Sequence, residues 1–143
     1  MSFFGKPLSA LDWNRGACDL FALAMNRVTG LPMHALIETA EKDGSRALVH
    51  AFCLIDSETM VDAVGFAPAM KAEDAVGTLY PGETSSFSVI PVSEKDLLEL
   101  RNHECDYDWE IEHSGIGEFL NTEILPQLKG KIAPEFRQHI QQH

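Results

Sequence analysis

The sequence has no long hydrophobic run, few basic residues and only three cysteines. No segment of the 143 residues approaches the roughly 20 apolar residues of a membrane-spanning helix. Cys18, Cys53 and Cys105 include no CxxC pair, which argues against a disulfide framework and a cysteine-only zinc site. With 11 basic against 22 acidic residues, the chain lacks the cationic surface that binds nucleic acid. These absences favour a soluble, cytoplasmic protein that contacts neither nucleic acid nor membrane directly.

The composition is that of one globular domain. The hydrophobic share is 45% and the charged share is 23%. A chain of this length buries roughly two thirds of its unfolded surface in a single core, so one domain is expected over residues 1–143. Residues 1–9 contain neither a long apolar stretch nor a small-residue cleavage site, so no secretory signal is expected there.

The first long helix is expected from Cys18 to Val28. This segment is rich in good helix formers, it follows Gly16, and Gly30 comes shortly after it as a terminating glycine. Its apolar side chains repeat with the spacing of one buried stripe at Phe21, Ala24, Met25 and Val28. The helix therefore belongs in the core.

Short strands are expected next, at Ala35–Glu38, Ala47–Ile55 and Met60–Val64. The two segments between them have turn chemistry, so the strands should form an antiparallel meander. The middle strand is apolar on both faces, as is typical of a central strand. One of its faces should carry Leu48, His50, Phe52 and Leu54.

The second half of the chain completes an α+β fold. Further elements are expected as a short helix at Pro68–Val76, a strand at Ser86–Val92, and helices at Gly117–Lys129 and Pro134–Gln142. Ser93 and Asp96 resemble a capping box that opens a helix through Leu100. The acidic segment Glu104–Glu112 has no clear period.

A thiol nucleophile needs a stabilised thiolate, a neighbouring imidazole and a group that orients the imidazole. Cys18 lies at the expected start of a helix, where free backbone N–H groups and the helix dipole favour a negative charge. If the hairpin turns at residues 56–58, paired residues have numbers that add to 114, and His50 and Asp62 become diagonal neighbours on one face. Asp62 would then hold the tautomer of His50. If the numbers of paired residues added to an odd value, His50 and Asp62 would lie on opposite faces of the hairpin.

The first half of the chain resembles the papain-like superfamily in its compact, transglutaminase-like form. The resemblance covers about residues 13 to 66, and the segments that carry it are Gly16-Ala17-Cys18-Asp19-Leu20-Phe21-Ala22, His50-Ala51-Phe52 and Val61-Asp62-Ala63-Val64-Gly65. It implies a helix packed on an antiparallel sheet, with Cys18 as nucleophile, His50 as general base and acid, and Asp62 as orienter. Many members place a Gln upstream of the cysteine; here Asn14 stands as the candidate second oxyanion donor.

The function implied by this resemblance is thiol-dependent hydrolysis or acyl transfer at an amide or isopeptide-type bond. The substrate would be a protein or peptide-like molecule, and no cofactor or metal is required. An alternative is that Cys18 is a small buried residue and His50 a satisfied core residue. A third interpretation is that the protein is a binding module that keeps the three residues but no longer catalyses a reaction.

A non-enzymatic function is the main alternative. Residues 94–123 contain ten acidic residues against Lys95 and Arg101. A small inhibitor of phage or mobile-element type could use this segment to occupy the basic, nucleic-acid-binding surface of a partner protein. The simpler interpretation, which we favour, is that the charge serves solubility alone.

Weaker candidates lie in the same region and at the C-terminus. His103, Glu104, Cys105, Asp106 and His113 are metal-capable, but their spacing favours a solvated loop. His139 and His143 could chelate adventitiously. Tyr107 and Trp109 are either a contact patch for a basic partner or an anchor that docks the loop. Cys53 is expected in the core.

Overall fold

The sheet is antiparallel and has five strands in the order β6-β5-β4-β3-β7. The computed structural model describes residues 2–3, 6–7, 18–63, 65–69, 78–100 and 106–128. The strands of the sheet are β3 (Met33–Ala40), β4 (Arg46–Leu54), β5 (Thr59–Asp62), β6 (Gly65–Pro68) and β7 (Ser85–Pro91). A separate two-stranded pair is formed by β1 (Ser2–Phe3) and β2 (Lys6–Pro7). The α+β class expected from the sequence is confirmed.

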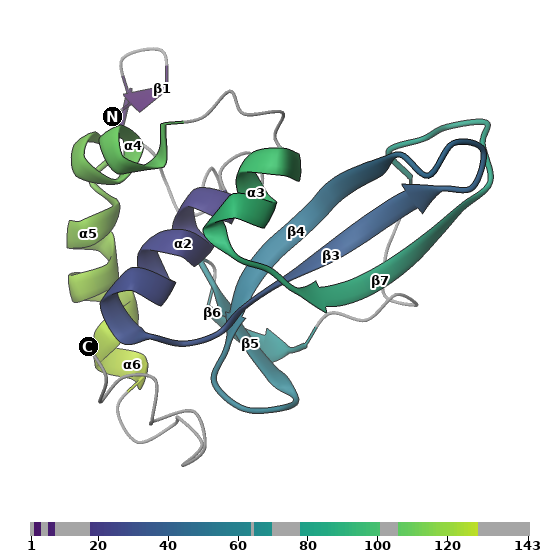
Figure 1. Ribbon diagram of the computed structural model, residues 1–143. Helices are drawn as coiled ribbons and strands as arrows, with labels where there is room; N and C mark the ends of the chain where they lie inside the picture. The colour runs from purple at the N-terminus through teal and green to yellow at the C-terminus, as the bar shows by residue number, and fades with distance from the viewer. Residues whose placement is uncertain are drawn as a thin grey trace.

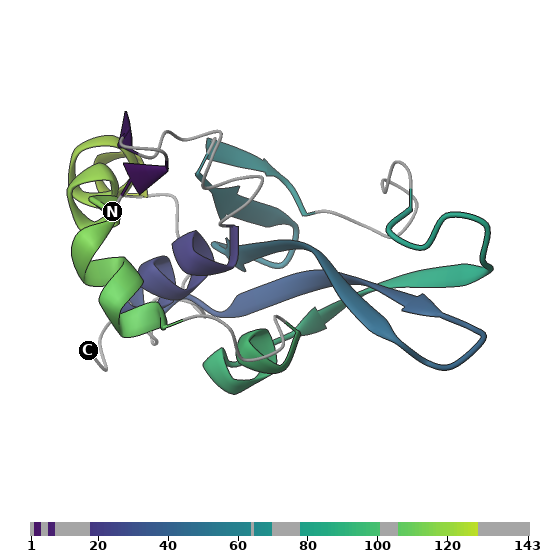
Figure 2. The same cartoon turned by 90° about the horizontal axis from the view of Figure 1, so that it is seen from above.

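The helices gather at one end of the molecule, and the sheet extends away from them (Figures 1 and 2). They are α2 (Cys18–Thr29), α3 (Glu94–Leu100), α4 (Tyr107–His113), and the consecutive helical segments α5 (Ile116–Phe119), η2 (Leu120–Ile124) and α6 (Leu125–Leu128). Helix α2 packs against β4, while α4 and α5 contact α2. The helices and the part of the sheet packed against them form the body of the molecule. Beyond this body, β3, β4 and β7 continue as a three-stranded arm (Figure 1). None of the described helices has the length and apolar character needed to cross a membrane.

Helix α2 is the centre of the core. From Cys18 to Met25 every side chain is buried. Its end is fixed by Gly30, whose φ of 75° suits a glycine and whose N–H donates to the Asn26 carbonyl at 2.7 Å. The predicted helix is therefore confirmed, but Val28 is 50% exposed, and its place in the buried stripe was wrong. In the last turn of α2, Arg27 and Val28 are exposed whereas Thr29 is buried, so Val28 lies on the side that faces solvent.

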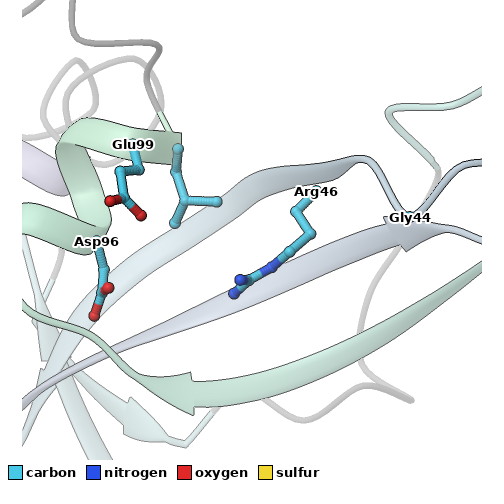
Figure 3. Close-up of a pocket in the computed structure, with 5 residues that line it drawn as sticks. Gly44, Arg46, Asp96 and Glu99 are labelled. Atoms are coloured by element: carbon cyan, nitrogen blue, oxygen red, sulfur yellow. The ribbon is translucent and has the colours of Figure 1, made fainter.

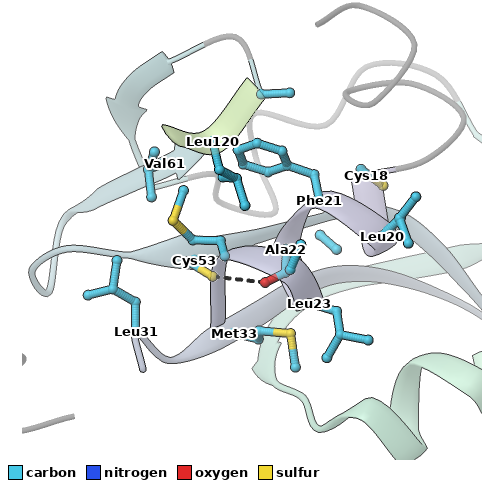
Figure 4. Packing of buried hydrophobic residues seen from close by; sticks show 14 of the residues in the cluster. Cys18, Leu20, Phe21, Ala22, Leu23, Leu31, Met33, Cys53, Val61 and Leu120 are labelled. Carbon is cyan, nitrogen blue, oxygen red and sulfur yellow. Dashed lines mark hydrogen bonds between the residues drawn. The ribbon is translucent and has the colours of Figure 1, made fainter. Parts of the chain in front are cut away.

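The side chains packed around α2 come from the sheet and from the C-terminal helices (Figure 4). Val61 and Cys53 contribute from neighbouring strands, and Leu120 contributes from η2. A smaller cluster, made of Phe52, Leu54 and Met60, lies apart from it. Because both clusters draw on β4, this strand is covered on both faces, as its sequence predicts.

The alternation expected along β4 is interrupted by an irregularity. Opposite β3, Leu36 pairs with His50 but Ile37 pairs with Leu48, so the register shifts by one residue. A bulge of this kind inserts an extra residue and re-aims the neighbouring side chains. Leu48 consequently packs against the α2 cluster, whereas Phe52 lies in the smaller one. The prediction that Leu48 and Phe52 share a face was wrong.

The second half of the chain confirms some predictions and corrects others. The capping box is present, because the Ser93 N–H donates to Asp96 Oδ2 at 2.9 Å and the Asp96 N–H donates to Ser93 Oγ at 3.2 Å. Pro68 belongs to strand β6 and not to a helix. The aperiodic acidic segment contains α4, which Asp106 caps through the Trp109 N–H. The helix expected at Pro134–Gln142 lies outside the described residues.

Candidate functional site

Cys18 is the first residue of α2 and is 6% exposed. In Figure 4 it lies at the start of the helix, at the margin of the hydrophobic cluster. The first backbone N–H groups of a helix have no partner within it, and they carry the positive end of the dipole. The position therefore favours negative charge on the sulfur.

The register of β4 and β5 brings His50 and Asp62 together. Cys53 pairs with Val61 and Leu54 pairs with Met60, so the predicted sum of 114 is confirmed. His50 Nε2 lies 3.0 Å from Asp62 Oδ2, and both residues are buried. The other carboxylate oxygen, Oδ1, accepts the Gly65 N–H at 3.3 Å. This second bond restricts rotation of the carboxylate and orients it toward the imidazole.

Cys18 and Asp62 together change the titration of His50. Burial lowers the pKa of the imidazole, but hydrogen bonds with Asp62 and Cys18, and the negative charge of both groups, raise it to about 9. His50 therefore holds its proton at neutral pH. Nε2 faces Asp62, and the thiol of Cys18 acts on the same imidazole. Thiol, imidazole and carboxylate form one connected set.

An apolar ring lies beside the imidazole. The Phe52 ring is fully buried, and its centroid is 5.9 Å from that of His50. Phe52 also stacks with His34, its partner on β3, and the two ring centroids are 6.5 Å apart. Burial lowers the pKa of His34. Phe52 thus packs near both imidazoles and keeps the surroundings of His50 low in polarity.

Cys53 shows what a structural cysteine looks like in the same chain. It is 0% exposed, its Sγ donates to the Ala22 carbonyl at 3.3 Å, and it points into the α2 cluster (Figure 4). Burial raises the pKa of its thiol. No imidazole or cation contacts it among the described residues. The expected core position of Cys53 is confirmed.

Asp19 and Tyr107 form a feature of the site that the sequence did not reveal. Asp19 follows Cys18 in the first turn of α2 and is 1% exposed. The Tyr107 hydroxyl donates to Asp19 Oδ2 at 2.6 Å and thereby joins α4 to the start of α2. The residues are 88 positions apart, and the only available signal was an aromatic residue within an acidic segment. Tyr107 is thus a buried anchor.

The other candidates are placed as follows. Trp109 is 48% exposed and stacks on His113, whose Nδ1 also contacts the Trp109 carbonyl at 2.9 Å. Asn14, His103, Cys105, His139 and His143 lie outside the described residues. Within the described ranges, no group of three His, Cys, Asp or Glu side chains has the geometry to hold a metal ion.

A cleft of about 310 Å³ lies between α3 and the arm, away from the triad residues (Figure 3). Asp96 and Glu99 project into it from α3, and Arg46 projects from β4. Gly44 and Leu100 complete the lining. It contains no thiol or imidazole, so it offers charge recognition without a nucleophile.

The chain was also compared with known proteins. No protein-family model, curated protein or solved structure matches it. The candidate site therefore rests on its own geometry.

Proposed function

We propose that this protein is a papain-like thiol hydrolase or acyltransferase that acts on an amide or isopeptide-type bond of a protein or peptide-like substrate. The observation that supports the proposal is the connected set of Cys18, His50 and Asp62. The thiol is at the start of a 12-residue helix, it raises the pKa of the His50 imidazole, and the Asp62 carboxylate lies 3.0 Å from His50 Nε2. Nucleophile, base and orienter are the three roles of such a site.

In the first half of the reaction, the Cys18 thiolate attacks the carbonyl carbon of the substrate. The Cys18 N–H stabilises the oxyanion of the tetrahedral intermediate. As this intermediate collapses, the bond between carbon and nitrogen breaks, and the His50 imidazolium gives its proton to the leaving nitrogen. An amine departs, and a thioester to Cys18 is left.

In the second half, water or an acceptor amine attacks the thioester, and His50 removes a proton from this attacking nucleophile. The bond between carbon and sulfur breaks, the Cys18 thiolate returns, and His50 is again an imidazolium. Asp62 holds the ring through both halves and stabilises its charged form. Asn14 is the candidate for a second oxyanion donor.

The two buried cysteines provide the test within one molecule. We would replace Cys105 by Ser and measure the alkylation rates of Cys18 and Cys53 by mass spectrometry from pH 5 to 10, with and without His50→Ala. We expect Cys18 to react at neutral pH while Cys53 stays unmodified, because only Cys18 has an imidazolium partner. His50→Ala should move the profile of Cys18 to higher pH.

The proposal would be contradicted if both thiols were equally unreactive, or if His50→Ala left the pH dependence of Cys18 alkylation unchanged. Once alkylation identifies Cys18 as reactive, a screen of amide substrates follows. Cys18→Ala should then abolish turnover, whereas Cys53→Ala should preserve it in protein that is still folded. Cys53→Ala controls for the removal of a buried sulfur.

A further inference from the structure

The outer edge of β7 presents unpaired backbone groups. The ladder between β3 and β7 is flanked by bonds from the Glu41 N–H to the Thr84 carbonyl at 2.9 Å and from the Val92 N–H to the Met33 carbonyl at 3.1 Å. Antiparallel pairs alternate between bonded and non-bonded, and this register has no shift. The bonded pairs are therefore the alternate pairs that include Ser86, Ser88 and Ile90. The N–H and C=O groups of the intervening β7 residues point away from β3.

Phe87 and Val89 thus offer two donors and two acceptors along the free edge. Within the described part of the chain, no strand lies beyond β7 and no hydrogen bond reaches these groups. Pro91, the next outward position, has a carbonyl but no N–H. In Figure 2, β7 borders the sheet on the side opposite β6.

This edge lacks the usual protection against strand pairing. Edge strands are commonly short, charged or interrupted by bulges. All seven residues of β7 are uncharged, in a chain of which 23% is charged, and proline occurs only at the last position. The opposite edge strand, β6, has only four residues. An open, regular and uncharged edge of this length can accept another strand.

The two ends of β7 carry an acidic surplus. The exposed charged residues at its amino-terminal end, including the β3–β4 hairpin, are Glu41, Lys42, Asp43, Arg46 and Glu83, which leaves a surplus of one negative charge. Past its carboxyl end, α3 exposes Lys95, Asp96 and Glu99. A seven-residue strand is about 24 Å long, so both ends are within reach of a single extended segment. The complement of this surface is a strand with cationic ends.

We propose that the free edge of β7 is a docking site for an extended, positively charged segment of a partner protein, which would add a sixth strand to the sheet. Main-chain bonds to Phe87 and Val89 supply the pairing, and the acidic ends select the charge. A second copy of this chain fits less well, because each copy carries a net charge of −11. The site is separate from Cys18 and does not depend on thiol chemistry.

The direct probe is a capped peptide of sequence Lys-Thr-Val-Thr-Val-Thr-Lys, with binding to the full chain measured by fluorescence anisotropy. Two matched peptides test the two parts of the proposal. N-methylation of every Thr and Val removes the backbone donors and should weaken binding at least about tenfold. Replacing both Lys by Glu should abolish binding, and about 0.5 M NaCl should weaken binding of the parent peptide.

Variants of the protein test the edge itself. Val89→Pro removes one outward donor without touching the ladder to β3, and Val89→Thr is its control because it keeps the N–H. We expect Val89→Pro to weaken binding about fivefold and Val89→Thr to leave it nearly unchanged. At the exposed position 88, Ser88→Lys should weaken binding and Ser88→Glu should strengthen it. Circular dichroism would verify that each variant is folded.

Equal binding of the methylated and parent peptides, or no binding of the parent, would overturn the proposal. A dimer that Val89→Pro dissociates would assign the edge to a second copy and would also overturn it. Cys18→Ala should bind the peptide as the unmodified protein does. Loss of thiol activity and loss of docking are therefore separate results.

Discussion

The sheet buries one carboxylate in the body of the molecule and another in the arm, and the two have different partners. Asp62 is 6% exposed and faces His50, whose pKa it raises together with Cys18. Glu38, on β3 in the arm, is 0% exposed. It accepts bonds from the Thr78 hydroxyl, the Ser85 hydroxyl and the backbone of the 78–80 loop.

These partners give the two carboxylates different capacities. Burial raises the pKa of Glu38, but bonds from Ser85, Thr78 and the Leu79 N–H outweigh it and lower the pKa. None of those donors titrates near neutral pH, so Glu38 fastens a loop to the arm and moves no proton. Asp62 adjoins an imidazole, which can release and regain a proton. A reactive site is therefore identified by the neighbours of a buried charge and not by its burial.

Alanine substitution of the two buried carboxylates should give the largest difference between the body and the arm. Asp62→Ala removes the orienter and should slow alkylation of Cys18 at pH 7 on the order of 100-fold, because the imidazolium loses its counter-charge. Glu38→Ala should leave that rate unchanged at a temperature where both variants are folded. Asp62→Asn keeps an acceptor and should restore part of the rate. Equal losses in both alanine variants would show a general effect of destabilisation.

The pH dependence of the unfolding free energy should show the titration of His50, which lies in the body of the molecule. Because the pKa of His50 rises from 6.5 to about 9 on folding, its contribution is fully present below pH 6.5 and is lost as the pH rises through 9. The unfolding free energy should fall by roughly 3 kcal/mol over this range. Urea titrations at several pH values measure it. His50→Gln should remove this slope, whereas substitution of the exposed His113 should preserve it.

Tyr107→Phe tests a third buried carboxylate, Asp19, which is held by a phenol. The variant keeps the ring and removes one donor from a buried charge, so it should cost about 1–2 kcal/mol of unfolding free energy. Chemical denaturation gives the value. Tyr80→Phe is the matched control and should cost less than about 0.5 kcal/mol. Similar losses at both positions would show that the bond to Asp19 adds nothing.

Arg27 forms ion pairs with exposed carboxylates, so its substitution should have the smallest effect on the unfolding free energy. Its guanidinium lies 2.7 Å from Glu94 and 2.8 Å from Asp108, and the side chains are 37%, 43% and 81% exposed. Arg27→Met should therefore cost less than about 1 kcal/mol, and the loss should shrink in high salt. Arg46→Met, with no ion pair among the described residues, is the control. A loss above that limit would indicate that Arg27 also packs the helices together.

Local rules were enough to predict the parts of the fold that depend on neighbours in sequence. The turn at 56–58 is fixed by Asp56 Oδ1, which accepts the Glu58 N–H at 2.8 Å, and this turn sets the register. That register places His50 beside Asp62. The start of α2 at Cys18 and the Ser93 capping box follow from equally local signals.

Features that depend on distant contacts were not predictable in this way. The irregularity between β3 and β4 is a property of the pair, so the alternation of β4 alone could not show it. Val28 matches the apolar stripe of α2, but whether a neighbour covers it depends on where the sheet ends. Helix α4 has a weak period because Tyr107 is its one buried residue. The catalytic roles of Cys18, His50 and Asp62 stay predictions until the thiol is tested.

The bond between Tyr107 and Asp19 also affects the order in which the site forms. During synthesis the ribosome produces Cys18, His50 and Asp62 well before residue 107, so the nascent chain holds the triad residues without α4. Closing an 88-residue loop is entropically costly, and contacts this distant form late in folding. The first turn of α2 is therefore fastened only after most of the polypeptide has been made. A nascent chain would carry its thiol without the finished site.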